Sequence, residues 1–354
     1  MNIGIPKEIK PLEGRVSLTP DACHQLVEAG HQVYIEKDAG LLSGYSNTDY
    51  QQAGCNVLDN AAEVYATGKL IVKVKEPVDG DLKLLKKQHL LFCFLHLAAE
   101  TALMAKLQTI GLTAVAFETV QTPQGELPLL LPMSVIAGRL AGQIGATLLH
   151  ETQQGKGILL GGIPTTERGN VVVLGAGNAG AAAIDVVASL GANVKVFDLD
   201  SHKLTTLQQR YANVTGLKPN LRLLQQAVSR ADLLIGAVLV AGARAPVLIS
   251  KEMVQSMQAG SVVIDIAVDQ GGCIETTHPT TYEKPTYRVN DITHFAVTNM
   301  PGAVPRTSTQ ALSAAILPYV EKLADDQIEN SAALAAGINI CDGKIVHPAL
   351  MSLT

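Results

Sequence analysis

Four polar residues have the types and positions that could bring chemistry to a small charged substrate. Arg15 lies in a loop after the first predicted strand, while Lys75, His96 and Asp269 each end an apolar run that we expect to form a strand. In a doubly wound α/β sheet, ligands bind beyond the carboxyl ends of the strands. We therefore expect the four side chains to face a common cleft, with three from one domain and one from another.

These residue types complement one another chemically. Arginine can grip a carboxylate through two parallel hydrogen bonds, and lysine can hold a carbonyl or imine and stabilise charge as hydride leaves. Histidine titrates near neutrality, so it can shuttle the proton of a water molecule that hydrolyses an iminium. A carboxylate can balance a substrate ammonium or share that proton transfer. The set therefore indicates an enzyme that oxidises an amino acid.

Each of these residues also has a purely structural interpretation. Arg15 could be a surface charge, and His96 could be a hydrogen-bonded core residue. Lys73 and Lys75 could be charges that keep a strand end soluble, and Asp269 could cap the segment that follows it. The convergence of four such residues at strand ends favours the functional interpretation.

A second motif predicts a dinucleotide site. The apolar run at 171–174 leads into a Gly-x-Gly-x-x-Gly sequence and then into a predicted helix at 181–190. The first glycine permits a tight turn, the second lets the backbone approach a pyrophosphate, and the third lets helix and strand pack closely. The helix N-terminus offers free N–H groups to the phosphates. The residues expected to line the cofactor here are Gly175, Gly177, Asn178, Ala179 and Gly180.

The next predicted strand, at 193–198, ends in Asp198, roughly 20 residues after the glycines, where a ribose-binding carboxylate belongs. Such a carboxylate would accept hydrogen bonds from the ribose hydroxyls and repel a 2′-phosphate, so NAD is favoured over NADP. Lys203 lies close enough to contact the cofactor, although a solvated helix lysine explains it equally well.

The elements that would hold these residues alternate between strand and helix, which implies parallel strands joined by right-handed crossovers. The expected strands are 2–6, 32–36, 70–75, 90–95 and 113–117, then 170–174, 193–198, 231–238, 261–268 and 295–299. Expected helices include 20–28, 132–151 and a stretch from about 307 to 323.

A chain of 354 residues suits two domains. We expect an α/β fold with two doubly wound Rossmann-like domains, the cofactor domain being inserted into a discontinuous substrate domain. The substrate and catalytic domain is expected at 1–130 and 305–354. The NAD-binding domain, with its connecting helices, is expected at 131–304.

Composition excludes several classes of function. The formal net charge of −5 argues against nucleic acid, because a phosphate-binding surface needs a basic excess. No apolar run reaches the ~20 residues of a membrane span, and the chain start lacks a signal-peptide pattern, so a cytoplasmic location is expected. The five cysteines are scattered without a CxxC pair, and no ligand pattern indicates a metal.

At several motifs the chain resembles the alanine dehydrogenase family, over nearly its whole length. The matching stretches are GIPKEIK at 4–10, RVSLTP at 15–20, VKVKEP at 72–77, LHLAAE at 95–100, LPMS at 131–134, GKGILLGG at 155–162, IAVDQGG at 266–272 and NMPGAVPRTS at 299–308. The resemblance implies reversible, NAD-dependent oxidative deamination of L-alanine to pyruvate and ammonium, carried out by a homohexamer.

The resemblance also implies roles for individual residues. Arg15 and Lys75 would hold the substrate carboxylate and carbonyl, and Met133 would line the alanine pocket. His96 and Asp269 would handle the proton, and which of them is the principal base stays open. The residues implied around NAD are Ser134, Asp198, Lys203, Val238, Leu239, Ile266, Val268, Asp269, Asn299 and Met300. Asn220 stands where relatives often carry a serine near the adenine ribose, so it is left out of the site.

Three alternatives remain. The nucleotide-binding subunit of proton-translocating transhydrogenase is similar in fold but does not oxidise alanine, and the joint presence of Lys75, His96 and Asp269 argues against it. Saccharopine-type dehydrogenases are a weaker resemblance for the same reason. A catalytically idle NAD-binding regulator would bind NADH without cooperating with pyruvate, whereas the enzyme would oxidise NADH only when pyruvate and ammonium are supplied.

Overall fold

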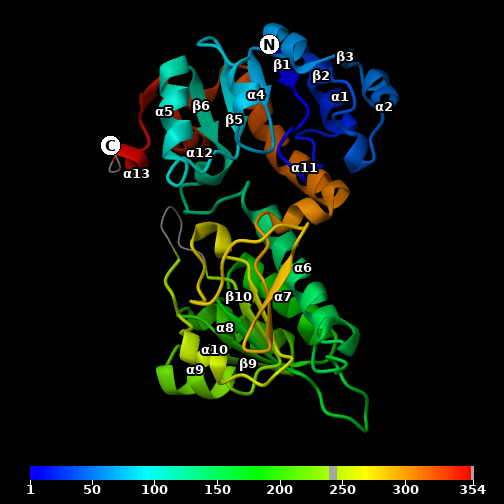
Figure 1. Cartoon of the computed structure of the whole chain (residues 1–354). Helices are drawn as coiled ribbons and strands as arrows, with labels where there is room; N and C mark the ends of the chain where they lie inside the picture. Colours follow the sequence, from blue (N-terminus) through cyan, green and yellow to red (C-terminus); the bar gives the residue numbers. More distant parts are fainter. Residues whose placement is uncertain (239–244, 352–354) are drawn as a thin grey trace. The chain divides into compact units, whose positions relative to one another are not determined.

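The computed structural model describes residues 1–238 and 245–351, and the chain divides into two compact units. Unit 1 consists of Met1–Met133 and Val304–Thr354, and unit 2 of Ser134–Ala303. In Figure 1, unit 1 combines the blue and cyan start of the chain with its orange and red end. Within the described ranges, no helix has both the length and the apolar character needed to cross a bilayer.

Unit 1 is built on an eight-stranded sheet with the order β15-β14-β6-β5-β4-β1-β2-β3. The strands from β3 to β6 are parallel and follow the order 3-2-1-4-5-6 of a doubly wound nucleotide-binding fold. Two antiparallel strands extend the sheet beyond β6. The bounds are β1 Asn2–Ile5, β2 Gln32–Glu36, β3 Asn56–Leu58, β4 Leu70–Val72, β5 Leu90–Cys93, β6 Thr113–Ala116, β14 Ile338–Cys341 and β15 Lys344–Ile345.

Helices connect the parallel strands of unit 1. The first begins where the sequence indicates, because the Thr19 hydroxyl accepts the Ala22 N–H and Pro20 occupies the first turn. The helices are α1 Pro20–Glu28, α2 Asn47–Gln52, α3 Ala61–Thr67, α4 Asp79–Leu82, α5 Thr101–Ile110, α11 Pro305–Ala324, α12 Ala332–Gly337 and α13 Pro348–Met351, with 3-10 turns η1 Leu41–Ser43, η2 Phe117–Thr119 and η6 Ile328–Asn330.

Unit 2 repeats the same topology. Its sheet order is β12-β13-β11-β10-β7-β8-β9, in which all strands except the edge strand β12 run parallel. The strands are β7 Asn170–Leu174, β8 Asn193–Phe197, β9 Val214–Leu217, β10 Leu233–Gly236, β11 Val262–Asp265, β12 Thr286–Val289 and β13 Ile292–Phe295. The helices are α6 Leu131–Leu148, which begins in unit 1, α7 Asn178–Ser189, α8 Ser201–Arg210, α9 Leu221–Val228 and α10 Lys251–Gln255, with 3-10 turns η3 Glu151–Gln153, η4 Val268–Gln270 and η5 Met300–Ala303.

Helices bury both faces of the sheet in unit 2, which explains why its central strand is apolar from Val171 to Leu174. Val171 and Val173 of β7 belong to one core cluster, together with residues of α6 and α7. Val172 and Leu174 belong to a second cluster on the other face, with residues of α9 and α10. Successive side chains of a strand point to opposite faces, so a strand covered on both sides needs apolar residues at every position.

The α/β fold class with two doubly wound Rossmann-like units is confirmed. The expected strand at 295–299 is wrong beyond Phe295, because β13 runs from Ile292 to Phe295. The chain then leaves the sheet and bonds to a neighbouring loop, where Ala296 and Thr298 exchange backbone hydrogen bonds with Thr280. Asn299 next adopts a positive φ of 60°.

Candidate active site

Arg15 is a buried residue whose orientation is set by Glu13. Only 2% of Arg15 is exposed, and its Nε lies 2.6 Å from Glu13 Oε1 while its Nη2 pairs with Glu13 Oε2. Such a two-point bond to a carboxylate restricts the guanidinium to one plane. A third contact joins Arg15 Nη1 to Met133 Sδ at 3.3 Å. The interpretation of Arg15 as a surface charge is therefore wrong, and the structure brings Arg15 and Met133 together.

A buried ion cluster lies beneath the segment that carries Lys75. Lys73 is 1% exposed, and its Nζ lies 3.2 Å from Glu8 Oε2 and 3.4 Å from Asp81 Oδ2. The Tyr65 hydroxyl donates to Asp81 Oδ1 at 2.8 Å. Burial lowers the pKa of Lys73, but the charges of Glu8 and Asp81 outweigh that effect and raise it. The interpretation of Lys73 as a solubilising charge is therefore wrong.

The same cluster holds the backbone next to Lys75. Glu8 Oε1 accepts the N–H of Val74 at 2.6 Å and that of Lys75 at 3.4 Å. Lys75 is 9% exposed, and its charge acts on the neighbouring Glu76. Burial raises the pKa of Glu76, while the charges of Lys75 and Lys10 more than reverse this, so that the net shift is downward. The interpretation of Lys75 as a charge that keeps a strand end soluble is therefore wrong as well.

Lys75 and His96 follow neighbouring strands. β4 and β5 pair in parallel with Val72 opposite Phe92, and two further backbone hydrogen bonds, Lys73 N–H to Phe92 O and Phe94 N–H to Val74 O, extend the contact past the strand ends. Both strands are shorter than expected, since β4 ends at Val72 and β5 at Cys93.

His96 is half-buried and lies in the segment after β5, with a positive φ of 52°. Its N–H donates to Glu118 Oε1 at 2.6 Å, its Nδ1 is 4.0 Å from the same oxygen, and its ring stacks on that of Phe94. The side chain is 38% exposed, so the interpretation as a core histidine is wrong. The ring is therefore accessible to solvent.

Unit 2 carries the glycine motif in the form that a dinucleotide site needs. Gly175 has φ +92°, and a Cβ there would lie 2.7 Å from the carbonyl oxygen of Ala237. A Cβ on Gly180 would lie 1.9 Å from the Gly175 carbonyl oxygen, so only glycine lets α7 pack onto this turn. Among the described residues, nothing lies within 4 Å of a Cβ placed on Gly177, directly before the helix N-terminus. Asn178 and Ala179 form the first turn of α7.

Asp198 lies directly after β8 and folds back towards the glycine turn. Its Oδ2 accepts the Ala176 N–H at 2.6 Å and its Oδ1 accepts the Asp200 N–H at 2.8 Å. These two bonds orient the carboxylate beside the glycine turn. Lys203 is half-exposed on α8, and its Nζ lies 4.0 Å from Asp200 Oδ2, which is the geometry of a solvated helix lysine.

Asp269 does not end a strand, as the sequence suggested, because β11 ends four residues earlier at Asp265. Asp269 lies in η4, and its Oδ2 accepts the N–H of Asn299 at 3.3 Å. The strand ends early because the buried Asp265 turns the chain. Its carboxylate accepts the N–H groups of Ala267, Cys273 and Ile274. Burial raises the pKa of Asp265, although these hydrogen bonds oppose the shift.

The remaining expected cofactor residues occupy several elements of unit 2. Ser134 is half-buried on α6, Val238 is half-buried after β10, and Leu239 lies outside the described residues. Ile266 and Val268 flank the turn made by Asp265, and the side chain of Met300 belongs to a core cluster. Asn220 caps α9 by accepting the N–H groups of Arg222 and Leu223.

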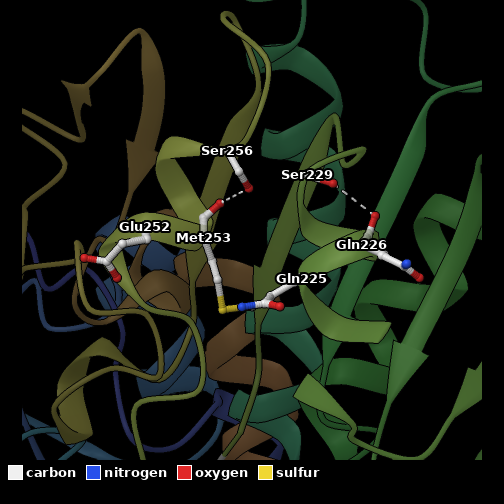
Figure 2. Close-up of a pocket in the computed structure, with 6 residues that line it drawn as sticks. All are labelled: Gln225, Gln226, Ser229, Glu252, Met253 and Ser256. Carbon is white, nitrogen blue, oxygen red and sulfur yellow. Dashed lines mark hydrogen bonds between the residues drawn. The ribbon is translucent and has the colours of Figure 1, made fainter. Parts of the chain in front are cut away.

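A hollow of about 320 Å³ between α9 and α10 is shown in Figure 2 and lies apart from these residues. Its lining comprises Gln225, Gln226, Ser229, Glu252, Met253 and Ser256. The hydroxyls of Ser229 and Ser256 donate to backbone carbonyls of their own helical segments. The hollow contains no expected site residue and no arrangement of groups that would bind a charged substrate.

Sequence reasoning missed the carboxylates that hold the site in place. Glu13 orients Arg15, Glu8 holds the Lys75 segment, Glu118 holds His96, and Asp265 shapes the loop of Asp269. Two of these had a visible signal, because Glu8 and Glu13 stand in the same stretches as the residues singled out near the chain start. Glu118 and Asp265 were missed because most of their partners are backbone N–H groups chosen by tertiary structure, with the Thr277 hydroxyl as a further donor to Asp265.

Comparisons with known proteins agree over nearly the whole chain. Family models described as alanine dehydrogenase/PNT, N-terminal domain and C-terminal domain match residues 4–137 and 141–348. Curated proteins named alanine dehydrogenase from Methanococcus maripaludis and Mycobacterium tuberculosis are each 45% identical, over 99% and 98% of this chain and 95% of each relative. A solved structure titled L-alanine dehydrogenase is 48% identical, with a TM-score of 0.96 over 100% of this chain and 99% of its own. A transhydrogenase from Sinorhizobium meliloti, 24% identical over 99% and 100% of the two chains with a TM-score of 0.85, shares the fold.

Proposed function

The chain belongs to the alanine dehydrogenase/PNT family, and from this premise we propose that it is an L-alanine dehydrogenase. The reaction is reversible: L-alanine, NAD+ and water give pyruvate, ammonium, NADH and a proton. The observation that carries the proposal is the geometry of unit 1. There a buried arginine oriented by Glu13 touches Met133, while Lys75 and His96 follow adjacent parallel strands.

In this proposal Arg15 and Lys75 bind the substrate. Arg15 holds the carboxylate, because a guanidinium already restricted to one plane loses little freedom when it binds a planar anion. Lys75 holds the carbonyl oxygen of pyruvate and stabilises the charge that develops during hydride transfer. Met133 contacts Arg15, and in this proposal it lines the alanine pocket.

We assign proton handling to His96 and Asp269 together. A histidine that is partly exposed can take the proton of the water molecule that attacks the iminium carbon and return it to the departing amine. Asp269 complements this by holding the substrate ammonium or sharing the proton. The hydrogen bond from the Asn299 N–H gives its carboxylate a defined orientation.

The described residues of unit 2 fit a dinucleotide. The close packing at Gly175 and Gly180 and the room that the described residues leave at Gly177 form a turn that a pyrophosphate can approach. NAD, when bound, supplies the nicotinamide that accepts hydride from the substrate carbon. We propose that this chain holds it with Ser134, Gly175, Gly177, Asn178, Ala179, Gly180, Asp198, Lys203, Val238, Ile266, Val268, Asp269, Asn299 and Met300, and with Leu239 outside the described residues.

Replacing Asp198 by alanine is expected to raise the dissociation constant for NADH about 10- to 100-fold, because a charge-assisted hydrogen bond contributes about 1.5–3 kcal/mol. The Michaelis constant for L-alanine at saturating NAD should change far less. Fluorescence titration of NADH and steady-state kinetics measure the two quantities. Asp59→Ala is the matched control, since Asp59 is an exposed aspartate of unit 1. Unchanged NADH affinity in Asp198→Ala would contradict the assigned ribose contact.

The decisive assay for the function follows NADH absorbance with the substrates supplied separately and together. We expect oxidation of NADH only when pyruvate and ammonium are both present, and reduction of NAD when L-alanine is supplied. A regulator without catalytic activity would bind NADH and leave the absorbance unchanged in every mixture. A transhydrogenase subunit would likewise fail to respond to pyruvate and ammonium. Either result would contradict the proposal.

We propose a homohexamer and a cytoplasmic enzyme with L-alanine, pyruvate and ammonium as its small-molecule partners. Light scattering coupled to size-exclusion chromatography measures the mass, and a mass of six chains of 37.3 kDa is the expected result.

A further inference from the structure

The backbone of His96 has an uncommon conformation for a residue with a side chain. Its φ of 52° lies in the left-handed region, where contact between Cβ and the backbone disfavours most residues. Such residues persist only where surrounding contacts hold them, and they cluster at functional sites. The groups that hold His96 in this conformation therefore bear on the geometry of its imidazole.

The His96 carbonyl accepts the N–H groups of Ala99 and Glu100, and one carboxylate provides the contacts on the N–H side. Glu118 Oε1 accepts the N–H of His96 at 2.6 Å, and the N–H of Leu95 lies 3.3 Å from Oε1 and 3.2 Å from Oε2. The same Oε1 is 4.0 Å from Nδ1 of the His96 ring. A single side chain thus engages two consecutive peptide groups and lies next to the imidazole. The Glu118 side chain is itself 16% exposed, so its bonds are shielded from water.

The sheet delivers Glu118 to this position. β5 and β6 are parallel, with Cys93 opposite Ala116, so the segments that follow them leave the sheet side by side. Phe117 is fully buried between these segments and contacts the ring of Phe94 edge-on at a centroid distance of 5.1 Å. The Phe94 ring in turn stacks on the imidazole, with an interplanar angle of 3°.

The far side of the 3-10 turn η2 is anchored as well. The Thr119 hydroxyl donates to the Gly337 carbonyl at 3.2 Å and accepts from Asn339 Nδ2 at 2.7 Å. β14, which contains Asn339, therefore fastens the turn that carries Glu118 to the sheet. Glu118 is held by packing on one side and hydrogen bonds on the other, which is what a supporting residue requires in order to position another side chain.

We propose that Glu118 is a positioning residue for His96, which it serves by accepting the N–H groups of residues 95 and 96. The proposal rests on the function proposed above, since it concerns the proton-handling histidine. Glu118 acts only through His96. The feature that matters is the acceptor oxygen Oε1, because the N–H groups of both residues reach it and it holds the left-handed backbone.

Glu118→Ala is expected to lower kcat/KM for L-alanine about 10²-fold, the lower end of what acid–base catalysis contributes. The loss should fall on kcat, with NADH affinity close to wild type. Glu118→Gln retains an acceptor oxygen and should recover most of the activity. Glu63→Ala is the control, because Glu63 also accepts a backbone N–H, from Asp59, at the surface of unit 1; it should behave as wild type.

A double-mutant cycle separates positioning from a general structural effect. In a His96→Ala background, Glu118→Ala should lower the residual turnover no further. An equal loss in both backgrounds would overturn the proposal, and so would wild-type kcat in Glu118→Ala or an equal loss in Glu118→Gln.

A crystal structure of Glu118→Ala gives a readout that needs no turnover. The φ of residue 96 should leave the left-handed region, and retention of a positive φ would overturn the proposal. This measurement stands even if the wild-type protein fails to oxidise NADH with pyruvate and ammonium, a result that would refute the function alone.

Discussion

Alanine in place of His96 should lower kcat/KM for L-alanine by about 10³-fold, within the ~10²–10⁴ that a positioned acid–base group contributes. The imidazole is 38% exposed and lies on neither the glycine turn nor the Asp198 segment. His96 belongs to unit 1, whereas every residue assigned to NAD belongs to unit 2. NADH affinity should stay within about twofold of wild type, because a residue that acts on the reacting substrate contributes to turnover rather than to cofactor binding.

Two measurements check this expectation. Steady-state kinetics in both directions give kcat/KM, and fluorescence titration gives the dissociation constant for NADH. His24→Ala provides the matched control, since His24 is an exposed histidine on α1 of unit 1. Normal turnover in His96→Ala would remove this residue from the mechanism, and a large loss of NADH affinity would move it to the cofactor site.

The second large effect is on stability. Lys73→Ala should lower the free energy of unfolding by about 3–5 kcal/mol, because removal of one member of a buried ion cluster leaves uncompensated charges. Lys73 is surrounded by two acceptors, Glu8 and Asp81, which would both lose their cation. Denaturant unfolding followed by circular dichroism measures the loss. Lys37→Ala is the control, because its pairing with Asp59 is exposed and its removal should cost less than about 1 kcal/mol.

The pH dependence of this variant has a definite sign. Burial already raises the pKa of Glu8, and the charge of Lys73 counteracts the shift. Without Lys73 the pKa of Glu8 rises further above its unfolded value, so folding is penalised once the pH exceeds that unfolded value. The deficit of Lys73→Ala relative to wild type should therefore shrink as the pH falls from mildly alkaline to mildly acidic. A deficit that grows on acidification would contradict the assignment.

The central strands could be predicted because a strand that is buried on both faces appears in the sequence as a continuous apolar run. β7 at Asn170–Leu174 and β2 at Gln32–Glu36 match the expected ranges. Short or antiparallel edge strands, such as β3 and β12, gave no comparable signal, since they bury fewer residues. The strand expected to end at Asp269 ends earlier, at Asp265, because the chain turns there to donate backbone hydrogen bonds to the buried Asp265 carboxylate.

For the site, residue types were easier to predict than the groups that orient them. Arg15, Lys75 and His96 stand out because charged or titratable residues interrupt apolar runs. Their orienting carboxylates look like ordinary polar residues until folding places them against backbone N–H groups. The GKGILLGG stretch at 155–162 stands out in the sequence, but its features are explained by packing. A Cβ on Gly161 would lie 1.8 Å from the Leu190 carbonyl oxygen. Lys156 forms an ion pair with Asp232.

The catalytic account rests on direct transfer of hydrogen from the α-carbon of alanine, and isotope transfer measures this most directly. L-alanine deuterated at the α-carbon should be incubated with NAD and the purified protein, and the NADH examined by mass spectrometry or NMR. We expect one deuterium in each NADH formed, in step with the pyruvate released. NADH that carries no deuterium, or an absence of NADH with every substrate present, would contradict the account.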